Sequence, residues 1–277
     1  MLGKADISMD ARAIGVFDSG LGGLTTVKVL AECLPGEDII YLGDTGRVPY
    51  GSRSKETIIK YALQDASFLT GFNIKAMVIA CNTVCAVAFD KLKGAYGVPV
   101  YEVVSIPAEA AITASKRKKI GVIGTAATIR SGAYEAAIKN LAPDASVFPV
   151  PCPLFVPLVE NDRTGDDDAA ALIIADGYLA DLRGQGIDTL IMGCTHYPLM
   201  RGVISKTIGV DVALIDSGAE TARFAAGDLA SRGLLSSNTS GGMVKCFVTD
   251  STDGFSDIAS RFLGSGIHSS VQQITLE

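Results

Sequence analysis

Two thiols occupy matching places in this chain, Cys81 and Cys194. Each follows a short apolar run that is typical of a buried strand, and each is followed at once by hydroxyl, amide or imidazole groups. These polar followers are Asn82, Thr83, Thr195 and His196. A buried strand that ends in a thiol and a polar turn can hold a base or a nucleophile at the edge of a sheet. The repetition predicts a site built from two facing halves, with one thiol on each side of a substrate.

The chemistry of the two cysteines depends on how readily each thiol loses its proton. A free thiol has a pKa of about 8.5, and a helix N-terminus or a basic neighbour lowers that pKa. Both cysteines precede a predicted helix start, and His196 lies two residues after Cys194, so we expect activated thiols. A lone cysteine at a strand end is more often a small core residue, and we assign a structural role to the other four. They are Cys33, Cys85, Cys152 and Cys246.

Two further polar segments follow predicted strands, at 18–23 and 44–51. The first reads Asp-Ser-Gly-Leu-Gly-Gly and opens a helix, so its backbone N–H groups suit a carboxylate or a phosphate. It is not a dinucleotide fingerprint, because Thr25 stands where the third glycine would be. Each segment alone is also compatible with a purely structural turn. Because the carboxyl ends of parallel strands meet at one edge, we expect Asp18, the segment 44–51 and Cys81 to lie close together.

A third segment, 152–160, is an apolar run interrupted by prolines that ends in Glu160. Core packing explains most of this run. The alternative is that Glu160 reaches the cleft and assists one of the two bases, so we keep it as a possible assisting acid.

The elements that position these residues alternate between short apolar strands and longer amphipathic segments, as βαβ units require. The strands are apolar throughout, which indicates a sheet covered on both faces. In the first part of the chain we predict strands at 13–17, 38–42, 76–80 and 98–103 and helices at 24–33, 54–70 and 84–93, with Ser54 as an N-cap. In the last part we predict helices at 217–235 and 251–263 and strands at 243–249 and 267–276, with Ser217 and Glu220 forming a capping box.

The pattern restarts in the middle of the chain, where 119–125 resembles 13–19. Ile14 and Ile120 lie 106 residues apart, and the two central cysteines lie 113 apart. We therefore predict an α/β protein with two similar doubly wound domains related by pseudo-twofold symmetry and an active site in the cleft between them. The first domain is 1–106 plus 217–277, which makes it discontinuous, and the second is 107–216. The alternative is that any two α/β domains contain such strands.

Composition narrows the class of protein. The chain has 277 residues, of which 48% are hydrophobic, and its net charge of −6 argues against nucleic acid or an anionic membrane as a partner. We interpret the basic run 116–119 as a solvated loop or helix end. Residues 1–12 lack the apolar core of a signal peptide, and scattered cysteines favour a reducing cytoplasm. No metal site is predicted, because the chain has no Cys-x-x-Cys pair and only two histidines, His196 and His268.

Taken together and in order, these residues resemble the glutamate racemases. The matching stretches are 14–23 (IGVFDSGLGG), 41–44 (YLGD), 49–51 (PYG), 80–83 (ACNT), 193–198 (GCTHYP) and 215–218 (IDSG). The segment 246–249 also resembles the late strand of that family, whereas 1–12 extends beyond its usual start. Each stretch alone is weak, but the ordered set is highly specific.

The resemblance implies a cofactor-independent enzyme that supplies D-glutamate for peptidoglycan, with two α/β domains around a buried cleft and a homodimeric assembly. It implies that Cys81 exchanges the α-proton of D-glutamate and Cys194 that of L-glutamate. Asp18 and His196 would assist the thiols, and Glu160 is a lesser candidate for assistance. The residues implied to hold the substrate are Asp18, Ser19, Tyr50, Gly51, Asn82, Thr83, Thr195 and His196.

The chemistry of inversion accounts for a pair of thiols. A base on one face and an acid on the other must exchange roles in the reverse direction, so two equivalent groups suit the task. No motif for pyridoxal phosphate is present, so desolvation and fixed donors must stabilise the carbanionic transition state. The alternatives are an aspartate or hydantoin racemase, or a hydrolase or transferase that uses only Cys194 with His196. A further alternative is a non-enzymatic role as a modulator of a DNA enzyme.

Overall fold

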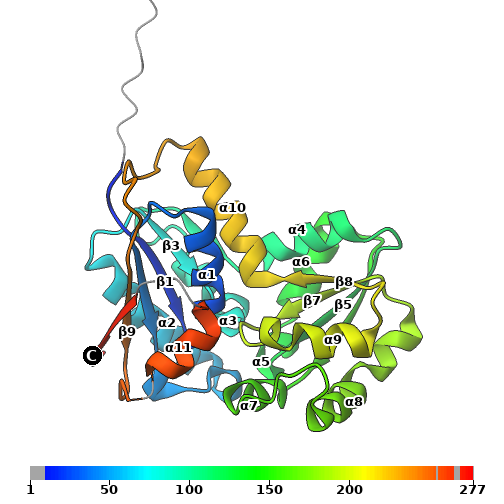
Figure 1. The fold of residues 1–277 in the computed structure, drawn as a ribbon. Coiled ribbons are helices and arrows are strands. Elements are labelled where there is room, and N and C mark those ends of the chain that lie inside the picture. Colours follow the sequence, from blue (N-terminus) through cyan, green and yellow to red (C-terminus); the bar gives the residue numbers. More distant parts are fainter. Residues whose placement is uncertain (1–9, 254, 265–268, 277) are drawn as a thin grey trace, which may run out of the picture.

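Two parallel sheets lie side by side in the computed structural model, which describes residues 10–253, 255–264 and 269–276. We call each sheet, with the segments that connect its strands, a lobe (Figure 1). The first lobe has the strand order β10-β9-β2-β1-β3-β4 and the second β6-β5-β7-β8. The first-lobe strands are β1 (Ile14–Asp18), β2 (Ile39–Gly43), β3 (Ala76–Ile79), β4 (Val100–Glu102), β9 (Val244–Val248) and β10 (Ser269–Gln273). The second-lobe strands are β5 (Lys119–Gly124), β6 (Ser146–Pro151), β7 (Thr189–Gly193) and β8 (Ala213–Asp216).

The two lobes repeat one strand order, β2-β1-β3-β4 and β6-β5-β7-β8. The register repeats as well, because Ile14 pairs with Ala76 on the next strand and Ile120 pairs with Thr189. The repeat visible in the sequence is therefore a repeat of structure. The prediction of two similar α/β units with parallel sheets is confirmed.

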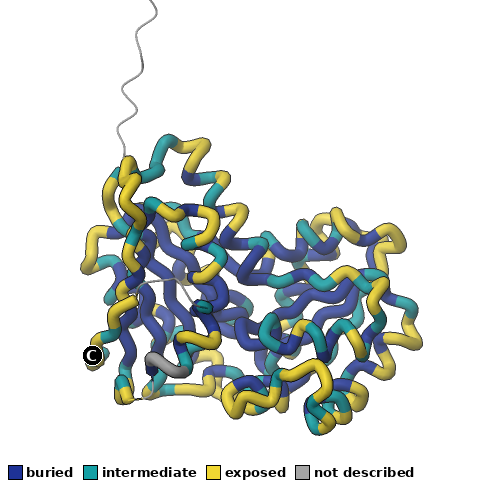
Figure 2. The backbone as a smooth tube through the Cα atoms, viewed as in Figure 1, coloured by how far each residue is buried: buried dark blue, intermediate teal, exposed yellow. Residues whose placement is uncertain are grey.

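Helices cover the sheets, and most residues of the central strands are buried between them (Figure 2). The helices are α1 (Leu24–Cys33), α2 (Lys55–Thr70), α3 (Asn82–Leu92), α4 (Ser105–Ala114), α5 (Ala126–Arg130), α6 (Ala133–Leu141), α7 (Phe155–Glu160), α8 (Ala169–Gln185), α9 (Arg201–Ile208), α10 (Ser217–Ser231) and α11 (Phe255–Leu263). Short 3₁₀ turns are η1 (Thr45–Arg47), η2 (Tyr50–Ser52) and η3 (Tyr197–Met200). Every residue of the strands β1, β3 and β7 is buried, which agrees with the expectation of a doubly covered sheet.

The chain crosses between the lobes through α4 and α10, which pack against each other (Figure 1). After the second crossing, β9 pairs with β2, so the last part of the chain returns to the first sheet. This strand order is compatible with the predicted ranges 1–106 plus 217–277 and 107–216, whose limits stay a prediction. Residues 1–9 and His268 lie outside the described residues.

Several predicted boundaries are wrong by a few residues. The N-cap of α10 is Asp216, whose carboxylate accepts a hydrogen bond from the Ala219 N–H at 3.0 Å, so Ser217 is already helical. A carboxylate at the end of β8 caps the helix one residue earlier than the serine would. Likewise α3 begins at Asn82, and Cys81 is its N-cap. The N-cap at Ser54 is confirmed, since its side chain accepts from Thr57 N–H.

A buried ion pair joins the amino ends of the first-lobe strands. Lys75 Nζ lies 2.5 Å from Glu37 Oε2, and neither side chain is more than 3% exposed. Lys75 Nζ also donates to the Asp10 carbonyl at 2.7 Å, and Glu37 Oε1 accepts from Ser236 N–H at 2.6 Å. The pair thus ties three separate segments to the start of β3.

Replacing Lys75 by methionine is expected to lower the free energy of unfolding by about 3–5 kcal/mol, because it leaves the Glu37 carboxylate buried without its partner. Urea unfolding followed by circular dichroism measures this loss. The control is Lys118→Met, which breaks an exposed pair with Asp144 that water screens. Equal losses in the two variants would contradict the structural role of the buried pair.

Candidate active site

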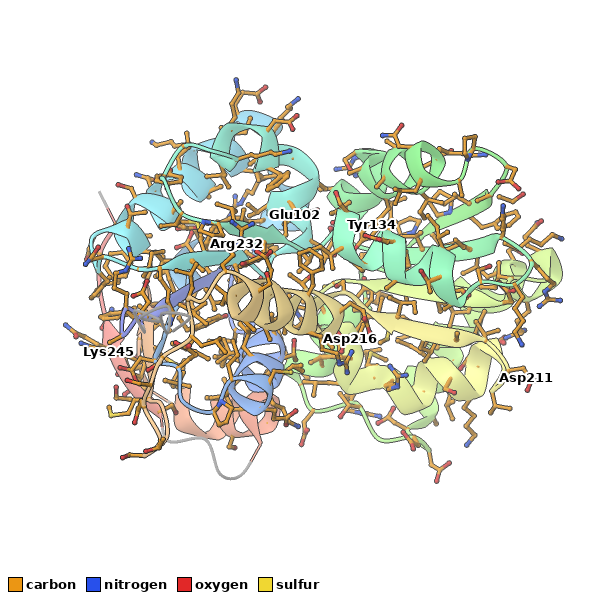
Figure 3. All side chains as sticks on the ribbon, turned by 90° about the horizontal axis from the view of Figure 1, so that it is seen from above. Glu102, Tyr134, Asp211, Asp216, Arg232 and Lys245 are labelled. Carbon is orange, nitrogen blue, oxygen red and sulfur yellow. The ribbon has the colours of Figure 1, made fainter. Side chains whose placement is uncertain are left out.

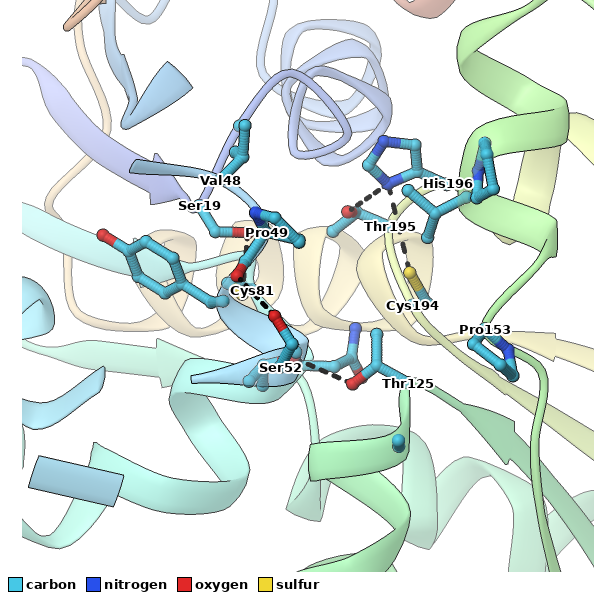
Figure 4. A pocket seen from close by; sticks show the side chains of 18 of the residues that line it. Ser19, Val48, Pro49, Ser52, Cys81, Thr125, Pro153, Cys194, Thr195 and His196 are labelled. Atoms are coloured by element: carbon cyan, nitrogen blue, oxygen red, sulfur yellow. Dashed lines mark hydrogen bonds between the residues drawn. The ribbon is translucent and has the colours of Figure 1, made fainter. Parts of the chain in front are cut away.

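A cavity of about 430 Å³ lies between the lobes, at the carboxyl ends of the central strands. Its wall contains ten predicted site residues: Ser19, Tyr50, Gly51, Cys81, Asn82, Thr83, Glu160, Cys194, Thr195 and His196. The two cysteines lie on opposite sides of the cavity, Cys81 beside Ser19 and Cys194 beside Pro153 and His196 (Figure 4). The structure therefore brings the two thiol-bearing turns to one cavity, as the sequence predicted.

Cys81 lies two residues after the strand β3 and is the N-cap residue of the helix α3, with only 4% of its surface exposed. Its Sγ donates to Ser19 Oγ at 3.4 Å. Burial, with the nearby negative charge of Asp18, raises the pKa of this thiol to about 12. The expectation of a lowered pKa is wrong for Cys81, because loss of solvation outweighs the helix N-terminus.

Asp18 lies behind the cavity wall rather than on it, and it is 1% exposed. Its Oδ2 accepts hydrogen bonds from the N–H groups of Gly20 and Gly23, at 3.2 and 3.0 Å. Its Oδ1 is buried and has no hydrogen-bond partner among the described residues. Burial raises the pKa of this carboxyl group, against the lowering effect of His196 and the glycine N–H groups. The glycine loop does bind a carboxyl group, but that group belongs to the chain's own Asp18.

Cys194 follows the strand β7 and is paired with His196. The Sγ atom lies 4.0 Å from Nδ1 of His196, and Thr195 Oγ1 lies 3.4 Å from the same nitrogen. On the other side of the ring, Nε2 lies 3.4 Å from Glu160 Oε1. Burial lowers the pKa of His196, but hydrogen bonds to Cys194 and Glu160 raise it to about 10 overall. The imidazole is therefore positively charged at neutral pH.

The proline-broken segment divides its residues between core and cavity. Phe155 and Val159 are buried in the core, as expected of most of the run. Pro153, Val156 and Pro157 instead line the cavity and form an apolar wall beside Cys194. Glu160, at the end of α7, reaches His196 although its side chain is 55% exposed. The segment thus supplies both a wall and a carboxylate.

Hydroxyl groups from the two lobes meet at the floor of the cavity. Thr83 Oγ1 lies 3.0 Å from Thr125 Oγ1 and 3.3 Å from Thr128 Oγ1. Thr125, the N-cap of α5, was not singled out from the sequence. The internal repeat could have found it, because the offset of 106 residues matches Ser19 with Thr125.

Tyr50 lines the cavity, but its hydroxyl is hydrogen-bonded to two carboxylates that do not line it. That hydroxyl donates to Asp44 Oδ2 and also lies 3.1 Å from Asp65 Oδ2. Arg47 bridges the two acids, with Nε 2.6 Å from Asp44 and Nη2 3.1 Å from Asp65. Tyr50 therefore offers its ring and backbone to the cavity, while the ion cluster fixes the 44–51 loop. The Asp44 N–H donates to the Asp18 carbonyl at 3.1 Å, which confirms that these loops are neighbours.

The remaining cysteines take no part in the cavity. Cys85, Cys152 and Cys246 are buried in the core, and Cys33 is exposed at the end of α1. Within the described ranges, no group of three or more His, Cys, Asp or Glu side chains is arranged to hold a metal ion. Across the same residues, no helix is both long and apolar enough to cross a membrane.

Known proteins are similar to this chain in both sequence and fold. Residues 22–225 match the family model for Asp/Glu/hydantoin racemases. A glutamate racemase of Geobacter metallireducens is 46% identical over 97% of this chain and 98% of its own length. The crystal structure of a Bacillus anthracis glutamate racemase isoform covers 96% of this chain and 99% of its own, with 39% identity and a TM-score of 0.90.

A second solved structure is that of the Francisella tularensis glutamate racemase in complex with D-glutamate. It has 37% identity and a TM-score of 0.89, and the match covers 97% of this chain and 99% of that one. Sequence and structure thus agree over almost the whole length. The chain belongs to the Asp/Glu/hydantoin racemase family and, within it, to the glutamate racemases.

Proposed function

We propose that this racemase interconverts L- and D-glutamate by proton transfer between two thiols. The observation that carries the proposal is the placement of Cys81 and Cys194 on opposite sides of one cavity. The relatives named above, which are glutamate racemases, support glutamate as the substrate. The cavity volume lies within the range of roughly 300–1,000 Å³ that is typical of small-ligand sites.

The groups around the cavity suit a small dicarboxylic amino acid. Hydroxyls of Ser19, Thr83, Thr125 and Thr195 and the amide of Asn82 supply donors for carboxylates. Pro153, Val156 and Pro157 form an apolar wall that excludes water from the reacting centre. Fixed donors in a dry site stabilise the charge that develops on the substrate when Cα loses its proton.

In the proposed reaction, Cα loses a proton on one face and gains another on the opposite face. The thiolate on one face takes the proton from Cα, and the thiol on the other face gives its proton to the carbanion, which inverts the centre. The first cysteine ends as a thiol and the second as a thiolate. Reaction in the opposite direction starts from that exchanged pair.

The two thiols have different surroundings. The positive charge on His196 lies beside the sulfur of Cys194, with Nδ1 4.0 Å from Sγ. Burial and the charge of Asp18 keep Cys81 protonated, since its pKa is raised to about 12. In this account Cys194 is the base toward L-glutamate and Cys81 is the acid. Asp18 assists by holding the glycine loop and by disfavouring the Cys81 thiolate, and Glu160 sustains the charge on His196.

The wider role follows from the same relatives. We propose that the product D-glutamate supplies peptidoglycan synthesis, that the enzyme works in the cytoplasm and that it forms a homodimer. Aspartate is the alternative substrate. The Picrophilus torridus aspartate racemase shares only 17% identity with this chain, so its similarity is one of fold alone.

Incubation with L-glutamate in D₂O, without added cofactor, is expected to yield D-glutamate that carries deuterium at Cα. The new proton comes from a thiol that has exchanged with solvent, so inversion and labelling occur together. Chiral chromatography with mass spectrometry measures both. Turnover of aspartate with none of glutamate would overturn the assignment of substrate.

Cys81→Ser and Cys194→Ser are each expected to reduce racemisation by about 10²–10⁴-fold, because each removes one of the two proton-transfer groups. Cys85→Ser is the matched control. Cys85 lies in α3, the helix that follows Cys81. Its Sγ donates to the Ile79 carbonyl at 3.3 Å, and serine can retain this bond. Retained racemisation in Cys81→Ser would sink the two-thiol mechanism and favour one that uses Cys194 and His196 alone.

The charge on His196 makes stability depend on pH. Its pKa is raised to about 10 in the folded protein from an ordinary value of 6.5, so folding favours the protonated ring. This contribution to stability is complete below pH 6.5 and is lost as the pH rises through about 10. We expect the difference in free energy of unfolding between the wild type and His196→Gln to shrink across this interval. A difference that stays constant from pH 6.5 to 10 would show that His196 is not charged in the folded state.

A further inference from the structure

The two catalytic turns are each held in place by residues of the other lobe. We call residues 81–83 the first turn and residues 194–196 the second turn. The first turn belongs to the lobe of β1–β4, and the second turn follows β7 in the other lobe. Neither turn is completed by its own lobe alone, as the following contacts show.

The second turn lies directly against the glycine loop of the first lobe. A Cβ atom built on Gly22 would lie 2.2 Å from Thr195 Oγ1 and 2.6 Å from His196 Nδ1. Real Cβ atoms do not approach other atoms this closely, so only glycine permits the contact. The imidazole of His196 also packs edge-on against Phe262 of α11, with ring centres 5.8 Å apart. His196 is therefore enclosed by first-lobe residues.

A hydrogen bond fixes the same contact. Thr25 is the second residue of α1. Its Oγ1 donates to the Thr195 carbonyl at 3.1 Å and shares that proton with the Gly22 carbonyl at 2.9 Å. The backbone of the second turn is thus tied to the first lobe next to Cys194. Thr25 is buried, so water does not compete for this bond.

The first turn is held in the same way from the second lobe. Tyr134 of α6 places its hydroxyl 2.5 Å from Asn82 Oδ1 and 2.5 Å from the Val103 carbonyl. Asn82 Nδ2 lies 3.2 Å from Ser217 Oγ at the start of α10. Figure 3 shows Tyr134 on the second lobe at the junction, across from Glu102 at the end of β4. Both polar atoms of the Asn82 side-chain amide, next to Cys81, are therefore hydrogen-bonded, Oδ1 to Tyr134 and Nδ2 to Ser217.

We propose that Gly22 and Thr25 position the Cys194 turn and that Tyr134 positions the Cys81 turn, so that each lobe aligns the thiol of the other. The proposal rests on the two-thiol reaction proposed above and adds residues that touch neither the thiols' protons nor the substrate. Its consequence is that the thiols become competent only when the lobes are closed. We call Gly22 and Thr25 one clamp and Tyr134 the other. A substitution in one clamp then slows the proton transfer at one thiol more than at the other.

The overall rate cannot report such an asymmetry. The two enantiomers have equal free energies in water, so kcat/KM must be the same in both directions for every variant. A deuterium at Cα, however, slows only the transfer in which that C–D bond breaks. Its isotope effect on kcat/KM is expressed when that transfer has the higher barrier and is masked when the other transfer does. The isotope effect is also independent of how much of the enzyme is folded.

For Gly22→Ala we expect kcat/KM to fall about 100-fold in both directions, as displaced catalytic groups commonly cause. The isotope effect should rise with Cα-deuterated L-glutamate, whose proton Cys194 removes, and fall with the deuterated D-enantiomer. Thr25→Val is the second variant. It keeps the shape of the side chain, removes the hydrogen bonds of Oγ1 to the Thr195 and Gly22 carbonyls, and should shift both isotope effects in the same directions to a smaller extent.

For Tyr134→Phe we expect the opposite pattern. The ring remains in the core, but the bond to the amide of Asn82 is lost, so the transfer at Cys81 is slowed. The isotope effect should rise with Cα-deuterated D-glutamate and fall with the L-enantiomer. The two clamps are thus distinguished by the direction of change, which a general loss of stability does not produce.

Two control variants carry the same types of substitution, Gly→Ala and Tyr→Phe, away from the cavity. Gly36→Ala places a Cβ 2.4 Å from the Asn238 carbonyl, at the amino ends of the strands and away from the cavity. Tyr101→Phe removes a tyrosine hydroxyl that donates to Asp228 Oδ2 at 2.7 Å. Both should lower thermal stability and leave both isotope effects at their wild-type values.

The proposal is overturned if Gly22→Ala and Tyr134→Phe leave the isotope effects unchanged or shift them in the same direction. It is also overturned if either control shifts them as the clamp variants do. These results differ from a failure of the proposed function, in which the wild type itself would not racemise glutamate or would retain activity without Cys81.

Discussion

A parallel sheet presents functional groups at one edge only, where the carboxyl ends of its strands meet. A substrate at that edge is therefore approached from one side, whereas inversion of a carbon centre needs groups on two opposite sides. The rest of this structure depends on how that constraint is met. Two sheets that share one four-strand order face one cavity, and each contributes the thiol that follows its β3 or β7 strand. The repeat within the chain is thus the architectural basis of a two-sided site.

The repeat does not make the halves chemically equivalent. Cys81 is backed by the buried carboxylate of Asp18, and Cys194 by the imidazole of His196, which Glu160 helps to keep protonated. An acidic group thus lies behind one thiol and a basic group beside the other. The proposed reaction uses this difference, with one thiol as the acid and the other as the base.

Much of the fold and the centre of the site could be predicted from the sequence, because they depend on local patterns. Apolar strands that end in Cys81 and Cys194 place both thiols at a sheet edge whatever the remaining packing is. The pKa of Cys81 could not be predicted in this way, since burial in the folded protein decides its direction. Nor could the occupant of the glycine loop, because a strand-end aspartate and a substrate carboxylate are equally suited to its N–H groups. Tyr134 acts across the lobes, and no local pattern marks a residue that becomes important only through such contact. Thr125 also acts across the lobes, but the internal repeat marks it as the counterpart of Ser19.

The central claim is that one Cα atom lies between two opposed thiols. A crystal structure of this enzyme with bound D-glutamate tests it most directly. The account predicts that Cα lies in the cavity with Sγ of Cys81 and Sγ of Cys194 in van der Waals contact on opposite faces, and with its hydrogen directed at Cys81. A substrate bound with both thiols on the same face, or with either thiol out of contact, would contradict it.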